Sequence, residues 1–155
     1  MTEEKFIKSL IIIVDSREQK PYLFKGYKTV VQGLPVGDYS LMNCQDIAIE
    51  RKSINDLIGS LSVGRERFEK EIQKASALPY FALVIEGRLS DLESGKYKSQ
   101  MKPESIVQTL VSWSVKYRLP VFFAESRHSG EKITLSLLQK YGRSIYQKYY
   151  SLAKT

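Results

Sequence analysis

Residues 37–60 read GDYSLMNCQDIAIERKSINDLIGS, and they contain the clearest structural signals of the chain. Two short segments within it, 37–41 and 47–51, have the apolar content of strands, and the turn between them favours a hairpin. Ser53 then provides a helix N-cap, and Asp56 three residues later completes the pattern of a capping box. The stretch therefore predicts a β-hairpin that runs directly into a helix.

Outward from this hairpin, the chain alternates between strand-like and helix-like segments. Buried or alternating apolar runs predict further strands, and apolar residues at helical spacing predict helices. The expected strands are 10–14, 27–32, 80–86 and 120–124, and the expected helices are 53–77, 103–117 and 133–152. Gly59 and Gly64 weaken the first of these helices and allow it to break in two. We expect one α/β domain over residues 1–155, with a mixed central β-sheet flanked by helices.

Composition narrows the class of protein. A chain of 155 residues with 43% hydrophobic and 11% aromatic residues can bury a proper core, which argues against disorder. Lys and Arg number 24 against 17 Asp and Glu, a formal net charge of +7. Such a surface favours a polyanion such as nucleic acid or an acidic membrane, although solubility alone is the alternative explanation.

The low number of cysteines and histidines argues against a disulfide and against a zinc site. One cysteine, Cys44, and one histidine, His128, leave no internal disulfide and no His/Cys zinc site. The apolar run at 10–14 is too short to span a bilayer, and no cleavage site of a secretory signal follows it. We expect a cytoplasmic protein without membrane attachment, free or associated with the nucleoid.

Acidic residues end three of the apolar segments. Asp15 follows the strand at 10–14, and side-chain alternation places Glu50 and Lys52 on one strand face with Arg51 on the other. If the two hairpin strands pair, Asp38 lies beside Glu50. Two carboxylates make a hard oxygen site for Mg²⁺ or Mn²⁺, and a nearby lysine can act on a metal-bound water and a phosphate. The pattern indicates phosphodiester hydrolysis, although Glu-x-Lys by itself is common on exposed strands.

The same residues resemble the nuclease domain of the XPF family of structure-specific endonucleases. The family signature is Gly-Asp, a spacer, Glu-Arg-Lys, three residues and Asp, and residues 37–56 match it in full. Val-Asp-Ser-Arg-Glu at 14–18 resembles the upstream Val-Asp-x-Arg-Glu element. Gly64-Arg65, 83–87 and the segment from Trp113 to Phe123 also follow the family order. The resemblance covers nearly the whole chain.

This resemblance implies a restriction-endonuclease-like fold and cleavage of DNA at branches, flaps or junctions, in repair or recombination. Carried over residue by residue, it implies that Asp38 and Glu50 bind Mg²⁺ or Mn²⁺ together with the Arg51 carbonyl. It also implies that Asp15 is a further acid of the metal site, direct or through water. Lys52 would serve the attacking water and the scissile phosphate.

Four residues are implied as supporting members of the active site: Arg17, Glu18, Arg51 and Asp56. Each has a structural alternative. Asp56 can serve only the capping box, Arg17 and Glu18 can form a mutual ion pair, and Arg51 can pair with Asp56.

Other basic residues are candidates for contacts with the DNA backbone. Arg65 and Arg67 follow the start of the catalytic helix, and three lysines surround Tyr97 in an expected loop: Lys96, Lys98 and Lys102. Basic residues beside an aromatic ring favour DNA, and a solvated flexible loop is the alternative. The tyrosine-rich C-terminal helix predicts core packing or a surface for a homodimer or a paired subunit.

We therefore expect a metal-dependent endodeoxyribonuclease. The chain is too short for the helix-hairpin-helix or helicase regions of better-known family members, so it is expected to stand as a nuclease domain alone. One alternative is a catalytically silent DNA-binding or scaffold subunit, and another is a nuclease of the same fold that acts on ordinary duplex. The presence of Asp38, Glu50 and Lys52 favours an active enzyme over a silent subunit.

Overall fold

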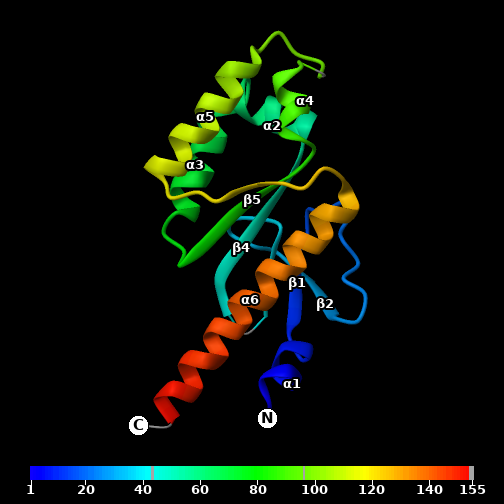
Figure 1. Cartoon of the computed structure of the whole chain (residues 1–155), viewed down its shortest axis with the longest axis vertical. Coiled ribbons are helices and arrows are strands. Elements are labelled where there is room, and N and C mark those ends of the chain that lie inside the picture. Colours follow the sequence, from blue (N-terminus) through cyan, green and yellow to red (C-terminus); the bar gives the residue numbers. More distant parts are fainter. Residues whose placement is uncertain (43, 96, 154–155) are drawn as a thin grey trace.

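The computed structural model describes residues 1–42, 44–95 and 97–153, which form one central sheet with helices around it (Figure 1). The elements in chain order are α1 (Glu3–Lys8), β1 (Ile11–Asp15), β2 (Lys28–Gln32), β3 (Tyr39–Leu41), β4 (Cys44–Ser53), α2 (Ile54–Leu61), α3 (Arg65–Ala75), β5 (Tyr80–Glu86), α4 (Leu89–Glu93), α5 (Pro103–Lys116), β6 (Val121–Phe123) and α6 (Arg127–Ala153).

The sheet has six strands in the order β2-β1-β3-β4-β5-β6. β3 pairs antiparallel with both β1 and β4, whereas β1–β2, β4–β5 and β5–β6 are parallel pairs. The expected mixed sheet flanked by helices is therefore confirmed. The antiparallel β3–β4 hairpin, predicted from the opening stretch of sequence, lies at the centre of the sheet.

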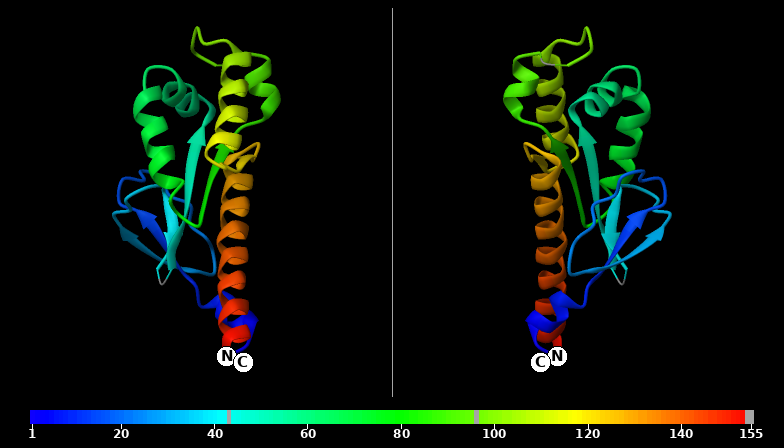
Figure 2. Two further views of the ribbon diagram at one scale, coloured as in Figure 1. Left: turned by 90° about the vertical axis from the view of Figure 1, so that its left-hand side faces the viewer. Right: turned by 90° about the vertical axis from the view of Figure 1, so that its right-hand side faces the viewer.

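Helices cover both faces of the sheet (Figure 2). Buried residues of α2, α3 and α5 pack on one face, together with Ala48 of β4 and Leu83 of β5. The other face meets α6 and includes Ile47 and Ile49 of β4 and Val84 of β5. Because successive strand residues alternate between these faces, β4 and β5 need apolar side chains on both sides.

The boundaries differ from the sequence-based expectation at several points. The segment 53–77 is two helices, since α2 ends at Leu61 and α3 begins at Arg65; the amide of Gly64 donates to the carbonyl of Gly59 (2.9 Å) at the break. The helices α1 and α4 were not expected, because each is too short to show an apolar period. α6 begins at Arg127, six residues before the predicted start at 133. The sequence did not indicate this first part of the helix, because it is polar and contains a glycine.

The last helix runs well past the sheet and meets the N-terminus. Tyr146 and Tyr150 both donate hydrogen bonds to the carbonyl of Met1, at 2.8 and 2.7 Å, and the rings of Tyr146 and Phe6 are 5.2 Å apart. Figure 2 shows α1 beside the last turns of α6. Although α6 is long, neither it nor any other helix in the described segments is apolar enough to cross a membrane.

Candidate active site

The hairpin brings Asp38 to Glu50, as the sequence predicted. The main-chain N–H of Asp38 donates to the Ile49 carbonyl, and Oδ2 of Asp38 accepts from the main-chain N–H of Arg51, both at 2.8 Å. Gly37 has φ +78°, and a Cβ there would lie 2.9 Å from the Cβ of Ala48. Only glycine allows this close approach, so the local geometry requires the glycine that precedes Asp38.

Asp38 and Glu50 form an electrostatically unfavourable pair in the absence of a cation. Burial is the main cause that raises the pKa of Asp38 to about 7 and that of Glu50 to about 8, and the charge of Asp38 adds to the shift at Glu50. The Glu50 side chain is only 13% exposed. Two buried carboxyls with raised pKa values gain from a divalent cation that neutralises both, which fits a metal site.

Lys52 lies on the same face of β4 as Glu50, as predicted. Its Nζ is 3.4 Å from Oε2 of Glu50 and 4.9 Å from the centre of the Phe68 ring on α3. The side chain is 18% exposed, so its charge can still reach a bound phosphate. The aromatic ring and the carboxylate together hold the ammonium group at the edge of the acid pair.

The main chain of Arg51 can supply a third oxygen. The N–H and C=O of one strand residue point to the same side, so the Arg51 carbonyl is directed to the side on which its N–H meets Asp38. In the described segments, no three side chains of His, Cys, Asp or Glu lie close enough together to form a metal site by themselves. The acid pair therefore fits Mg²⁺ or Mn²⁺ only with the carbonyl and with water or phosphate oxygens as further ligands.

Asp15 has a different role from that expected of a direct ligand. Its Oδ1 accepts from the Leu34 N–H (2.8 Å), and its Oδ2 accepts from Nε and the main-chain N–H of Arg17 (2.8 and 3.3 Å). Burial alone would raise the Asp15 pKa, but these hydrogen bonds outweigh it and lower the pKa. Both carboxylate oxygens are occupied, so Asp15 fits a contact through water better than direct ligation. Its own N–H donates to the Asp38 carbonyl (2.8 Å), which holds β1 beside the site.

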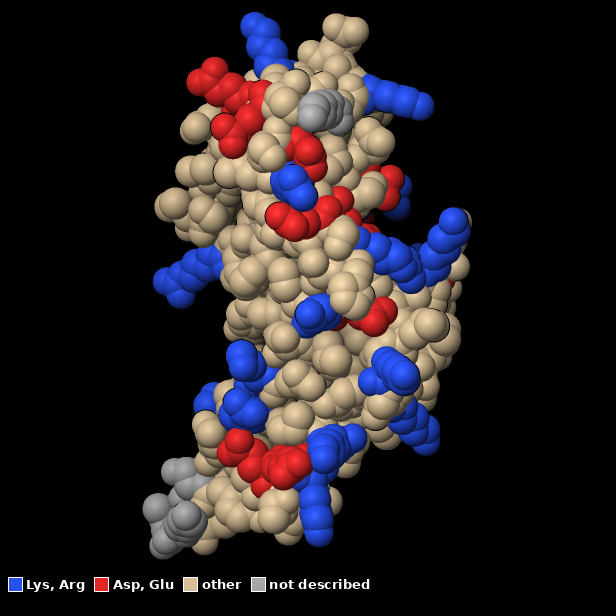
Figure 3. All heavy atoms as spheres, turned by 45° about the vertical axis from the view of Figure 1, so that its right-hand side comes forward, with Lys and Arg blue, Asp and Glu red and all other residues tan. Residues whose placement is uncertain are grey.

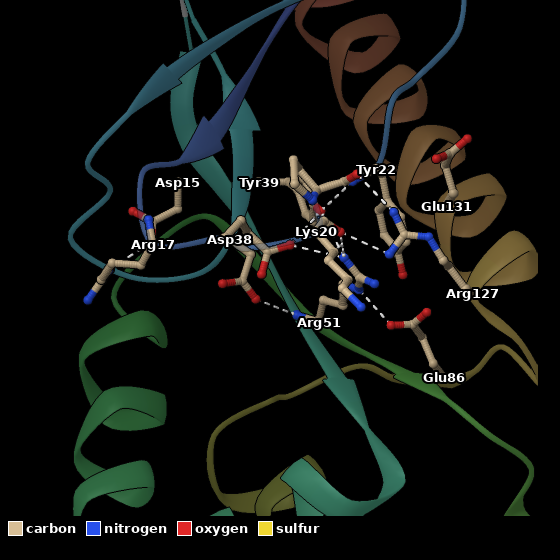
Figure 4. A network of polar contacts seen from close by, with 12 residues as sticks. Asp15, Arg17, Lys20, Tyr22, Asp38, Tyr39, Arg51, Glu86, Arg127 and Glu131 are labelled. Atoms are coloured by element: carbon tan, nitrogen blue, oxygen red, sulfur yellow. Dashed lines mark hydrogen bonds and ion pairs between the residues drawn. The ribbon is translucent and has the colours of Figure 1, made fainter.

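Two of the structural alternatives for the supporting residues are wrong. Arg17 pairs with Asp15 and not with Glu18, whose Oε2 instead accepts from Nη1 of Arg51 at 3.1 Å. Arg51 pairs with Glu86 (Figure 4) and with Glu18, and not with Asp56. Glu86 was not expected as a site residue, because nothing in the sequence links it to Arg51 across 35 positions.

Asp56 takes part in the cap of α2 through its main chain only: within the described residues its carboxylate does not accept from the Ser53 N–H, so the predicted capping box is incomplete. Its main-chain N–H donates to the Ser53 side chain at 3.1 Å, which confirms Ser53 as the N-cap of α2. Asp56 also lines a hollow of about 410 Å³ beside Lys52, together with Arg67 and Glu71. Glu71, on the face of α3 that carries Phe68, was missed from sequence; its charge contributes to the raised pKa of Glu50.

The candidate DNA contacts fall into different environments. Arg67 is 88% exposed at the rim of this hollow, where a phosphate could reach it. Arg65 instead donates to the Thr109 hydroxyl (3.0 Å) and lies 5.8 Å from the Trp113 ring, so it joins α3 to α5.

The loop before α5 gives less support to DNA binding. Lys98 and Lys102 are exposed, but Tyr97 packs against the core and its hydroxyl donates to the Met101 carbonyl (2.6 Å), so it is not a free stacking surface. Lys96 lies outside the described residues. Basic side chains are spread along the face in Figure 3 and interrupted by acidic ones.

The fold and this strand-end site define a nuclease domain of the XPF type. Residues 14–137 match the model of the ERCC4 domain, so the chain belongs to the ERCC4 domain family. A 3'-flap repair endonuclease Xpf from Saccharolobus solfataricus is 30% identical over 136 residues, covering 84% of this chain and 55% of that protein. The chain thus spans about half the length of this curated relative.

Solved structures support the same fold. XPF from Aeropyrum pernix superposes with a TM-score of 0.68 at 20% identity, covering 84% of this chain and 61% of that chain. A structure of XPF from the same organism in complex with DNA gives a TM-score of 0.66 at 19% identity, covering 87% and 66%. These structural similarities confirm the predicted fold.

Proposed function

We propose that this chain is an endodeoxyribonuclease that uses Mg²⁺ or Mn²⁺ to hydrolyse phosphodiester bonds. The observation that carries the proposal is the placement of Asp38 beside Glu50, with Lys52 at 3.4 Å from Glu50. Two carboxylates that can hold a cation and a lysine that can act on water and phosphate lie together at the end of a strand. These are the groups that metal-assisted phosphodiester hydrolysis needs.

Each protein group has a distinct task in the proposed reaction. A bound divalent cation supplies Lewis acidity and a water of lowered pKa. Asp38 and Glu50 hold the cation, and the Arg51 N–H fixes which oxygen of Asp38 remains free for it. Lys52 places a positive charge where negative charge develops on the phosphate and can hold the attacking water.

We propose branched DNA, such as a flap or a junction, as the substrate, with a role in repair or recombination. The support is the relative named as a 3'-flap repair endonuclease, the similar XPF structure in complex with DNA, and the net charge of +7. Because the acid pair and Lys52 are present together, we favour an active enzyme over a silent scaffold subunit.

We also propose that the chain works as a homodimer or with a paired subunit. Val111 and Val115 lie one turn apart on α5 and are 51% and 79% exposed, and Tyr149 near the end of α6 is 69% exposed. The two valines on α5 are neighbours and favour a protein interface there, whereas Tyr149, at the opposite end of the molecule (Figure 1), is a separate candidate contact.

Cleavage of labelled flap, splayed-arm and plain duplex DNA tests the proposal. We expect cutting near the branch with Mg²⁺ or Mn²⁺, none with chelator, and none by the Asp38→Asn variant. Equal cutting of plain duplex would support a nuclease of the same fold with another target. DNA binding without cleavage under any metal condition would support the silent subunit.

A further inference from the structure

The Arg51 side chain joins the ends of three strands on the face of β4 opposite Glu50. Its Nη1 lies 3.1 Å from Oε2 of Glu18, just after β1, and its Nε lies 2.5 Å from Oε1 of Glu86, at the end of β5. The guanidinium also stacks over the Tyr22 ring, at 4.1 Å from its centre (Figure 4). Arg51, Glu18 and Glu86 are 13%, 16% and 11% exposed, so the charges are paired away from solvent.

The two carboxylates on Arg51 are anchored differently. Glu18 also accepts a hydrogen bond from the Tyr39 hydroxyl (2.6 Å), so it remains fixed by β3 if Arg51 moves. Glu86 comes from β5, where it stands opposite Ser53 in the parallel register. It is the acceptor for Nε of Arg51, so its loss would leave Nε without that partner, whereas Nη1 would keep Glu18 and the Lys20 carbonyl.

A shift of Arg51 would reach the candidate metal site through the main chain. Arg51 lies between Glu50 and Lys52, and its N–H is the donor that holds Oδ2 of Asp38 at 2.8 Å. The side chain of Arg51 thus fixes, from behind the sheet, the segment that orients the acid pair. Groups that orient ligands in this way are often as important for metal affinity as the ligands themselves.

The first turn of α6 packs against Glu86 and Tyr22. A Cβ at Gly130 would lie 3.2 Å from Cγ of Glu86 and 2.4 Å from the hydroxyl of Tyr22, so only glycine fits there. Arg127 donates to two carbonyl groups of the loop after β1, and Arg51 donates to one of the same groups. The side chains around Arg51 therefore form one packed unit, in which Glu86 is the acceptor for Nε of Arg51.

We propose that Glu86 is a positioning residue for the metal site: it fixes the guanidinium of Arg51 and thereby the N–H that holds Asp38 beside Glu50. This inference rests on the proposed function, since it assigns Glu86 to that same site. Glu86 itself touches neither metal nor DNA. Its loss should weaken metal binding while DNA binding in the absence of metal stays unchanged.

The test compares the full chain with its Glu86→Ala and Glu86→Gln variants. Mn²⁺ binding without DNA is measured from the free-ion spin resonance signal, and the single-turnover cleavage rate is then measured against Mn²⁺ concentration. We expect Glu86→Ala to weaken Mn²⁺ binding about tenfold or more, in line with other ligand-orienting groups. Glu86→Gln keeps an acceptor for Nε of Arg51 and should recover most of the affinity.

Glu125→Ala is the matched control. Glu125 also pairs with an arginine, Arg88, but at 3.5 Å and with 64% of its side chain exposed, so its loss should leave Mn²⁺ binding unchanged. If Glu86→Ala does not fold, Glu86→Asp replaces it, because its shorter side chain withdraws the carboxylate from Arg51 and carries the same expectation.

The outcomes separate this inference from the proposed function. If the unaltered chain neither binds Mn²⁺ nor cleaves DNA, the proposed function itself is wrong and the inference falls with it. If the unaltered chain does both, and folded Glu86→Ala binds Mn²⁺ equally well, only the positioning role is overturned. Weaker Mn²⁺ binding with unchanged DNA affinity, recovered by Glu86→Gln, supports it.

Discussion

The main-chain N–H of Arg51 donates a 2.8 Å hydrogen bond to Oδ2 of Asp38. This bond joins the start of β3 to the end of β4, and it uses one carboxylate oxygen of Asp38 while leaving the other for a cation. The side chain of the same arginine lies on the far face of the sheet between Glu18 and Glu86. One residue thus connects the reactive edge of the sheet to the packing behind it.

Replacing either acid by its amide should abolish cleavage and preserve the fold. Asp38→Asn and Glu50→Gln keep side-chain size but remove a charge needed to hold the metal-bound nucleophile. We expect a loss of about a thousandfold or more in single-turnover rate, which is several kcal/mol of barrier. Circular dichroism should be unchanged. Near-normal turnover by either variant would disprove the metal-site assignment.

The metal-free protein should lose stability as pH rises. A carboxyl whose pKa is higher in the folded than in the unfolded state stabilises the fold fully below the unfolded value of about 4, and this stabilisation is lost as pH rises through the folded value. The folded pKa values are about 7 for Asp38 and about 8 for Glu50. The free energy of unfolding of the metal-free protein should therefore fall as the pH rises from weakly acidic to weakly basic.

Thermal unfolding with and without Mg²⁺ measures this effect. The rise in Tm caused by Mg²⁺ should be larger at pH 8 than at pH 6, because protons compete with the cation for the two carboxyls. Glu50→Gln should flatten the pH dependence of the metal-free protein. A Mg²⁺ effect that does not vary with pH would contradict the paired-acid interpretation.

Replacing Lys52 should affect the cleavage rate, whereas replacing Arg67 should affect DNA affinity. Lys52→Ala should lower the rate at saturating DNA with little change in affinity, because its interaction is made mainly in the transition state. Arg67→Ala should weaken binding and reduce the salt dependence by one phosphate contact, a slope change of about 0.9 on duplex DNA. Affinity at several salt concentrations and single-turnover rates distinguish the two; the reverse pattern would mean that the roles are exchanged.

Arg65 serves as the comparison for Arg67. The sequence made both residues candidates for backbone phosphate, but Arg65 is bonded to Thr109 and lies near the Trp113 ring. Arg65→Ala should therefore lower the free energy of unfolding and change the salt slope less than Arg67→Ala does. A full slope change for Arg65→Ala would restore its role as a phosphate contact.

Alanine should have opposite effects at two helical glycines. At Gly59 in α2 an added Cβ meets nothing within 4 Å, so Gly59→Ala should stabilise the protein by about 0.5–1 kcal/mol. At Gly130 in α6 the added Cβ would lie 2.4 Å from the Tyr22 hydroxyl, so Gly130→Ala should destabilise it. Urea unfolding of the two variants checks this, and stabilisation by Gly130→Ala would contradict the packing around Tyr22.

Light scattering should show a species of about twice the 17.8 kDa chain mass at micromolar concentration if the chain pairs with itself. Val115→Glu places a charge on the exposed face of α5 and should reduce that mass if this face is the interface. A monomer at all concentrations that still cleaves DNA would contradict the homodimer.

The sequence alone determined those features that depend on short-range geometry. Alternation along a strand places Glu50 and Lys52 on one face and Arg51 on the other, and the Ser53 hydroxyl caps the helix that follows. The hairpin then brings Asp38 to Glu50. These relationships follow from backbone sterics and local hydrogen bonds, which a few adjacent residues specify completely.

The pairing of charges that are far apart in the sequence depends on the tertiary structure. Arg51 meets Glu18 and Glu86, 33 and 35 positions away, and the two carboxylate oxygens of Asp15 accept hydrogen bonds from Leu34 and Arg17. With 24 basic and 17 acidic residues, many pairings are compatible with the sequence. The choice among them depends on how the strands and α6 pack, because burial makes an unpaired charge costly and only the folded chain determines which partners lie within reach.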